Sequence, residues 1–114
     1  MKLSEMQNLP IRIAIYIPST YNVNIPIDNT EIVNNTAEMF SGLFGGSTAT
    51  ESTGYYISES KELISEKVTI VYSYTDKKTF LKNEDKILNY ANLIKSEMKQ
   101  ESISIEYQNK LYFV

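Results

Sequence analysis

The side chains of this chain that could do chemistry are carboxylates, tyrosines, hydroxyls and lysines. The 114 residues include no cysteine and no histidine. Thiol nucleophiles, thiolate metal sites and the commonest proton shuttle near neutral pH are therefore excluded. We assign no catalytic, cofactor-binding or metal-binding residue from the sequence, and any enzyme of this composition would have to rely on carboxylate, lysine or hydroxyl chemistry.

Glu66 is the carboxylate that the pattern singles out. By alternation it shares a strand face with Val68 and Ile70. We expect it to be buried near the end of a sheet and hydrogen-bonded to a tyrosine or a backbone amide. A structural role is favoured, because a satisfied buried polar group is commoner than an active-site acid. Glutamates 51, 59, 62, 101 and 106 are expected to be solvated or paired with lysine.

Nine tyrosines in 114 residues suggest a contact surface. Tyrosine offers wide, stiff contact area to a protein partner, whereas in RNA-recognition sheets aromatic side chains stack on bases. The net charge of −3 disfavours phosphate binding, and strand 67–73 lacks aromatic residues on the face that we expect to be open. We therefore expect a protein partner, with nucleic acid disfavoured, and a candidate interaction surface of Tyr16, Tyr21, Tyr56 and Val71.

The segment Gly45-Gly46-Ser47-Thr48 has the composition of a phosphate-binding loop. Such loops lead from a strand into a helix, whose first amides complete the site. Here the glycines follow a predicted helix and precede a predicted strand. We therefore interpret Gly45 as a helix stop.

Predicted strands and helices, recognised by their different sequence periodicity, position these residues. Residues 11–17 alternate strictly between isoleucine and other side chains, which predicts a half-buried strand that ends at Pro18. A loop, residues 19–27, follows; either it is functional, or Val23, Ile25 and Ile27 pin it over the sheet edge. Asp28 and Glu31 have the form of a capping box that starts the first helix.

The rest of the chain repeats this alternation of strand and helix. The helix that starts at Asp28 should end at Gly45, and Thr75 or Asp76 should cap a second helix that ends near Lys99. The remaining predicted strands are residues 47–58, 62–74, 102–107 and 111–114.

This order predicts an α+β fold of the ferredoxin-like βαββαβ type. It would have a four-stranded antiparallel sheet, two helices on one face and a short additional C-terminal strand. The open sheet face should then be mixed in polarity and able to close by dimerisation. The side chains that we expect on it are Arg12, Ala14, Tyr16, Lys67, Thr69, Val71, Ser104 and Glu106.

The second half of the chain resembles a family of small bacterial and phage-type proteins known only as a domain of unknown function. Its pattern is G-x-T, G-x-W, an acidic residue opening a hydrophobic strand, and Q-E-S-V. The corresponding segments here are Gly46-Ser47-Thr48, Gly54-Tyr55-Tyr56, Glu66-Lys67-Val68 and Gln100-Glu101-Ser102-Ile103. Tyr56 and Ile103 depart from the pattern. The resemblance implies a ferredoxin-like fold and no established activity.

Length and composition indicate one domain, residues 1–114, with residues 1–9 as a flexible N-terminus. We expect a cytoplasmic protein, since no apolar run has the length of a signal peptide or a membrane span.

We predict a non-enzymatic protein-binding domain that acts through the open sheet face or an edge strand. It would associate with itself as a homodimer, and it could also bind another protein, as a phage or mobile-element inhibitor of a host defence complex would. The alternative is a small dimeric ferredoxin-like enzyme that holds an organic substrate between sheet and helices, with Glu66 and a tyrosine as acid and base.

Overall fold

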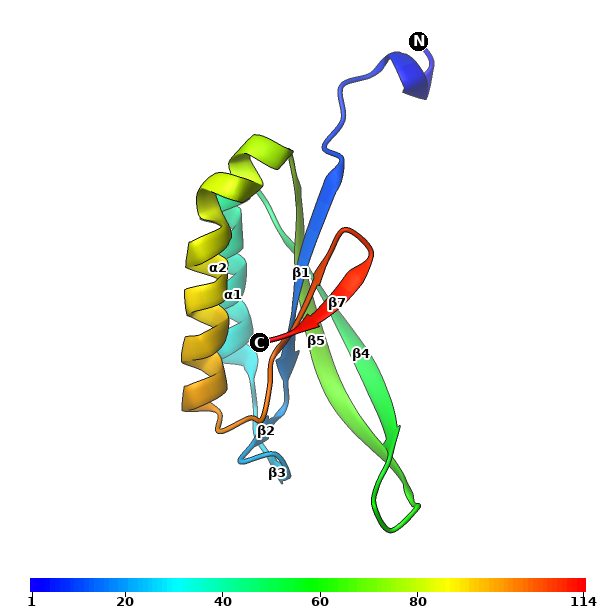
Figure 1. Ribbon diagram of the computed structural model, residues 1–114, viewed down its shortest axis with the longest axis vertical. Helices are drawn as coiled ribbons and strands as arrows, with labels where there is room; N and C mark the ends of the chain where they lie inside the picture. Colours follow the sequence, from blue (N-terminus) through cyan, green and yellow to red (C-terminus); the bar gives the residue numbers. More distant parts are fainter.

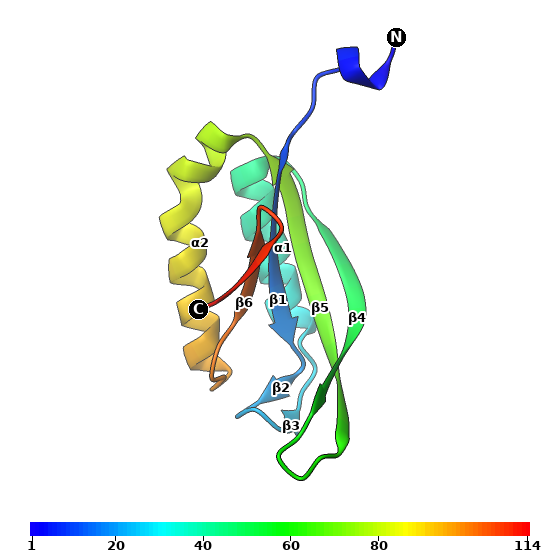
Figure 2. The same ribbon diagram turned by 45° about the vertical axis from the view of Figure 1, so that its right-hand side comes forward.

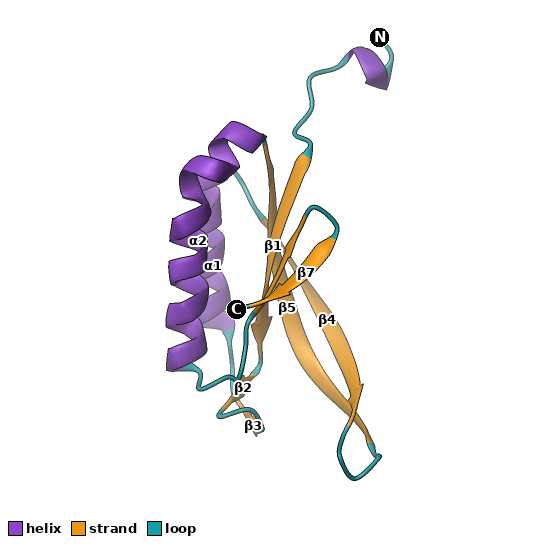
Figure 3. Ribbon diagram, viewed as in Figure 1, coloured by secondary structure: helices purple, strands orange, loops and turns teal.

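The computed structural model describes all 114 residues, as a five-stranded antiparallel sheet with two helices on one face (Figure 1). The sheet order is β4-β5-β1-β6-β7. Its strands are β1 (Ile11–Pro18), β4 (Thr48–Ile57), β5 (Leu63–Thr75), β6 (Ser104–Tyr107) and β7 (Lys110–Phe113). The helices are α1 (Thr30–Phe44) and α2 (Lys77–Glu97), and both lie on the same side of the sheet (Figure 3).

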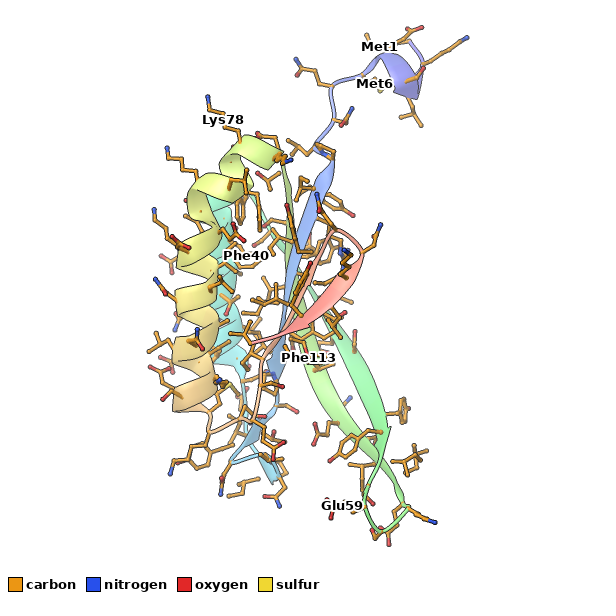
Figure 4. The ribbon with its side chains drawn as sticks, in the orientation of Figure 1. Met1, Met6, Phe40, Glu59, Lys78 and Phe113 are labelled. Atoms are coloured by element: carbon orange, nitrogen blue, oxygen red, sulfur yellow. The ribbon has the colours of Figure 1, made fainter.

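The central strand β1 supplies the core. Its four isoleucines, at positions 11, 13, 15 and 17, are at most 7% exposed and face the helices. Phe40 of α1, which is fully buried, points into the space between helix and sheet (Figure 4). Between the helices, the hydroxyls of Thr36 and Tyr90 form a hydrogen bond of 2.7 Å. Alternation in one strand and helical spacing in two helices therefore converge on a single core.

The two helix starts differ from one another. In α2, Asp76 caps the helix by accepting a hydrogen bond from the Thr79 amide at 2.8 Å, as predicted. In α1 the capping box is wrong: Asn29 is the N-cap residue, and Asp28 accepts from the Thr30 amide instead. At the other end of α1, Gly45 has φ +91°, and this confirms the helix stop.

The predicted α+β class is confirmed, but the sheet has five strands rather than four. The terminal strand β7 pairs with β6 from Ser104↔Phe113 to Tyr107↔Lys110. The two residues between them, Gln108 and Asn109, both have positive φ, the geometry of the tight hairpin turn that matches strand twist. The C-terminal strand is thus a full member of the sheet.

The faces of β5 are reversed from the prediction. Pairing with β1 sets Ser73 opposite Ile13 and Val71 opposite Ile15, so these small side chains face the helices. Val71 is fully buried and cannot belong to an open surface. The side chains of Val68, Ile70, Tyr72 and Tyr74 lie on the open face, with Tyr16 and Glu66. Small residues on the covered face let α1 approach β5 closely.

This reversal also bears on the prediction that nucleic acid is disfavoured. Tyr72 and Tyr74 stand on the open face beside Arg12, whose guanidinium lies 4.0 Å from the Tyr72 ring centre. The open face therefore carries aromatic side chains that alternation alone assigns to the covered side. The acidic composition still disfavours contacts to phosphate.

The segments outside the main sheet lie at its two ends. Residues 1–10 project from the start of β1 and include a single 3₁₀ turn, Leu3–Glu5 (Figures 1 and 4). The predicted loop after β1 contains a small two-stranded sheet of β2 (Thr20–Tyr21) and β3 (Ile25–Pro26), seen most clearly in Figure 2. Val23 and Ile25 are 39% and 49% exposed, so they do not pin this loop. No helix combines the length and apolar character that a membrane span requires.

Replacing Phe40 with alanine tests the core. The side chain is fully buried among the isoleucines of β1, so Phe40→Ala is expected to lower the free energy of unfolding by about 3–5 kcal/mol. Urea titration followed by circular dichroism measures this loss. Leu81→Ala on the outer side of α2, where the side chain is 54% exposed, should change it by less than about 0.5 kcal/mol. Similar losses in the two variants would contradict this placement of the core.

Candidate functional site

A hollow of about 270 Å³ lies on the open face where β1 ends. Strand β1 stops at Pro18, opposite Val68, while β5 continues through residues 63–67 with only β4 as its partner. On the other side of β1, the link from α2 enters β6. The hollow is the notch between these two flanks. Its lining residues are Tyr16, Pro18, Gly54, Tyr55, Tyr56, Glu66, Val68, Gln100, Ser102, Ile103 and Ser104.

This notch, which we call the β1-end pocket, gathers three segments that are far apart in the sequence. They are residues 54–56 on β4, Glu66 on β5, and residues 100–104 before and at the start of β6. The same segments carry three of the four motifs quoted above. The fourth, Gly46-Ser47-Thr48, lines a separate hollow at the other end of β4. One pocket thus accounts for motifs that the sequence shows only as separate short matches.

Glu66 is the only ionisable carboxylate in the lining. It is half-buried, and its carboxylate forms no hydrogen bond or ion pair within the chain, so the expected buried partner is absent. Its cross-strand neighbour is Gly54, which has no side chain to cover it. A carboxylate left free in a hollow is available to a ligand.

Polar side chains fix the end of β1 and so shape the pocket. Ser19 donates to the Lys67 carbonyl at 2.7 Å, and Asn29 donates to the Pro18 carbonyl at 3.1 Å. The Gln100 amide group donates to the Thr20 carbonyl at 2.8 Å. These bonds tie β1 to β5, to the start of α1 and to the segment after α2. Both flanks of the notch are therefore held against the strand end between them.

Tyr16 forms part of a polar cluster at the edge of the pocket. Its hydroxyl donates to Glu106 Oε1 at 3.2 Å. Arg12 Nη2 lies 4.0 Å from the same oxygen, which is the single ion pair of the chain. Burial raises the pKa of Tyr16, and the negative charge of Glu106 raises this pKa further. Tyr16 is therefore a neutral phenol throughout the neutral range.

The structure brings together only some of the predicted surface residues. Tyr16 and Tyr56 both line the β1-end pocket, and Tyr56 is 48% exposed. Tyr21 lies elsewhere, with Lys99 5.5 Å from its ring centre, and Val71 is in the core. Sequence reasoning placed Ser104 correctly on the open face but missed Gly54, Tyr55, Gln100 and Ser102, which belong to the family-like motifs. Their presence there was the available signal, but strand alternation could not show that these motifs meet.

A second, apolar cavity of about 360 Å³ lies between α2 and the terminal hairpin. Nine of its ten lining residues are hydrophobic, and Phe80 stacks on Tyr107 within it at a centroid distance of 4.0 Å. Its only charged lining residue is Glu84. The alternative proposed from the sequence placed the substrate between sheet and helices, but Glu66 and its tyrosines lie on the opposite face. The β1-end pocket is therefore the better chemical candidate.

Alkaline titration tests the Tyr16 cluster. The difference in tyrosinate absorbance between the wild type and Tyr16→Phe isolates this residue, and the midpoint that gives its pKa should lie above the ordinary value of 10.0. Glu106→Gln should lower that midpoint, because it removes the negative charge that opposes ionisation. A wild-type midpoint at or below 10.0 would contradict the geometry.

The same pKa shift has a consequence for stability. Between the unfolded and folded pKa values of Tyr16, the folded state holds the proton that the unfolded state has lost. This contribution is complete below the unfolded value and disappears as the pH rises through the folded one. Stability should therefore fall less steeply above pH 10 in Tyr16→Phe than in the wild type, as measured by urea unfolding at a series of pH values.

Two solved structures share this fold. A phage SAM lyase in complex with S-methyl-5′-thioadenosine aligns with a TM-score of 0.68 and 16% identity, over 100% of this chain and 95% of that one. A phage SAM lyase in the apo state aligns with a TM-score of 0.66 and 17% identity, over 96% and 94%. No protein-family profile matches the sequence, and no curated protein does so.

These matches correct the functional prediction. The sequence predicts a non-enzymatic binding protein, whereas both structures that share the fold over nearly the whole chain are of an enzyme. The prediction of a non-enzymatic domain that inhibits a host complex is therefore wrong, and the alternative of a small enzyme fits better. The phage origin of both structures agrees with the phage-type family that the sequence resembles.

Proposed function

We propose that this chain is an enzyme that cleaves S-adenosylmethionine in the β1-end pocket. The observation that carries the proposal is the charge of the lining: one free carboxylate and three tyrosines, with no lysine or arginine. The likeness of the whole fold to a phage SAM lyase supports the same substrate. The pocket volume, about 270 Å³, is close to the lower end of small-molecule sites, roughly 300–1,000 Å³.

The lining suits a sulfonium ligand. S-adenosylmethionine carries a permanent positive charge on sulfur, and aromatic faces attract such cations by roughly 0.5–2 kcal/mol. Glu66 adds a full negative charge, while the chain as a whole has a net charge of −3. The adenine ring can stack on an exposed tyrosine, and Tyr56, which shares the open face with Glu66, is 48% exposed.

The ligand of the lyase complex suggests which bond would break. S-methyl-5′-thioadenosine keeps the methyl group, the sulfur and the adenosine carbon, so cleavage falls between sulfur and Cγ of the methionine part. The bonding electron pair goes to sulfur, which becomes a neutral thioether. An oxygen of the substrate's own carboxylate forms the new bond to Cγ and closes a five-membered lactone. Atoms and charges balance without water or a co-reactant.

The pocket favours this step in three ways. No lysine or arginine lines it, so the substrate carboxylate has no cationic side chain to hold it away from Cγ. As the carboxylate oxygen bonds to Cγ, the C–S electron pair moves to sulfur, so the negative charge on oxygen and the positive charge on sulfur both decrease in the transition state. Beside the tyrosine rings of the lining, such a charge-neutralising step is easier than in bulk water. Holding the two reacting groups of one molecule in a folded conformation supplies the rest.

Three further points belong to this proposal. The first is that β4, β5, β1 and β6 form a ferredoxin-like unit, which β7 extends. The second is that the chain belongs to the phage-type family, three of whose four motifs line the pocket. Self-association also stays a prediction, and sedimentation at micromolar concentration tests it.

Incubation of the purified chain with S-adenosylmethionine tests the function. Mass spectrometry should detect S-methyl-5′-thioadenosine and homoserine lactone in equal amounts. Glu66→Gln should lower kcat/KM by about 10- to 100-fold, the loss expected for roughly 1.5–3 kcal/mol of charge-assisted binding. Glu59→Gln, at the exposed tip of the β4–β5 hairpin (Figure 4), is the matched control and should leave the rate unchanged.

A variant that fills the pocket tests whether the reaction takes place there. Gly54 has room for a side chain, since an added Cβ would meet only the Glu66 carbonyl at 3.8 Å. Gly54→Val should fold, yet fill the pocket and abolish product formation. Full activity in this variant would place the reaction elsewhere, and absence of both turnover and binding in the wild type would refute the proposed function. An unsaturated four-carbon product in place of the lactone would show that the carboxylate is not the nucleophile.

A further inference from the structure

We infer that Glu106 and Arg12 act as positioning residues that fix the Tyr16 hydroxyl as a hydrogen-bond acceptor towards the ligand. This makes the pocket select a cationic ligand over its neutral counterpart. The inference rests on the proposed function and names what the same site uses to choose its substrate. Tyr16 lines the β1-end pocket, whereas Glu106 and Arg12 lie beside it on the open face.

The register of the sheet builds this cluster. Glu106 of β6 lies directly opposite Ala14 of β1, and Arg12 and Tyr16 are the residues two positions to either side of Ala14. Diagonal neighbours on one face of an antiparallel pair are within reach of long side chains. Ala14 is fully buried and small, so it leaves room for both to bend towards Glu106. One carboxylate thus receives a phenol from one side and a guanidinium from the other.

The hydrogen-bonding capacity of tyrosine limits how the Tyr16 hydroxyl can meet a ligand. A phenol has one proton and acceptor lone pairs. The Tyr16 proton is directed to Glu106 Oε1 at 3.2 Å, which is a charge-assisted bond. Only the lone pairs of the Tyr16 oxygen then remain for the pocket. The oxygen presents the negative end of its dipole there, and it can meet a cation or a donor but not a ligand carboxylate.

Arg12 holds the carboxylate in this role. Its Nη2 lies 4.0 Å from the Glu106 oxygen that receives the Tyr16 proton, and its guanidinium is held over the Tyr72 ring at 4.0 Å. Its Nε is buried without a hydrogen-bond partner. Packing on the aromatic ring, rather than full hydrogen bonding, therefore keeps the guanidinium in place. Arg12 and Tyr16 thus approach the same carboxylate oxygen from either side of the Ala14 position.

Calorimetric binding of two non-reacting analogues tests the inference. Sinefungin carries an ammonium group in place of the sulfonium, and S-adenosylhomocysteine carries a neutral sulfur. The wild type should prefer sinefungin. Tyr16→Phe, which lacks the acceptor oxygen, should reduce the ratio of the two affinities by about threefold to tenfold. Glu106→Ala, which frees the Tyr16 proton to point into the pocket, should do the same.

A conservative variant separates positioning from charge. The amide side chain introduced by Glu106→Gln keeps an oxygen that can accept the Tyr16 proton, so this variant should retain most of the wild-type ratio while Glu106→Ala loses it. Equal losses in both variants would mean that the charge of Glu106 acts directly on the ligand, which would overturn the positioning role.

The failure of this inference is distinct from failure of the proposed function. If the wild type binds and distinguishes the two analogues, but Tyr16→Phe and Glu106→Ala distinguish them equally well, the inference is wrong and the proposed function stands. If the wild type binds neither analogue, the proposed function fails and the inference fails with it. Thermal unfolding of each variant shows that it is folded, and Tyr16→Phe provides the test even if Glu106→Ala is unstable.

Discussion

Burial of the isoleucine face of β1 is the interaction on which the rest of the structure depends. Four isoleucines of one strand are almost completely removed from water by α1 and α2, and burying such a side chain is worth roughly 1.5–3 kcal/mol. This places β1 at the centre of the sheet, with β5 on one side and β6 on the other. Once β1 is fixed, pairing decides which face every neighbouring residue occupies.

The candidate site exists because this central strand stops early. Strand β1 ends at Pro18, which has no N–H to extend a ladder, while the β4–β5 ribbon continues beyond it. A sheet whose central strand is shorter than its neighbours has a notch at that end. The residues that line the notch come from the end of β1, from the start of β6 and the link before it, and from the parts of β4 and β5 near and beyond the end of β1.

Local sequence pattern predicts several parts of this architecture, whereas tertiary packing decides which face of β5 the helices cover. Gly45 is recognisable as a helix stop because a left-handed residue at that point favours glycine, and the β4–β5 hairpin is predicted within one or two residues of its bounds. Val68 and Ile70 resemble a core stripe by hydrophobicity, but Val71 occupies the core because α1 lies close above it. Hydrophobic alternation says that a strand has two faces and not which one the helices cover. Glu66 therefore lies on the open face, where its exposure to the pocket, rather than burial, makes it a candidate.

By itself, the sequence determined the α+β class, the order of the main elements and the absence of thiol and imidazole chemistry, because these depend on composition and local periodicity. Only the tertiary structure decided that Gly54, Glu66 and Gln100 lie around one hollow, and that Tyr16 shares its proton with Glu106. Those juxtapositions depend on strand order and register. Register is set by the packing of the whole sheet against two helices, and no short stretch of sequence contains that information.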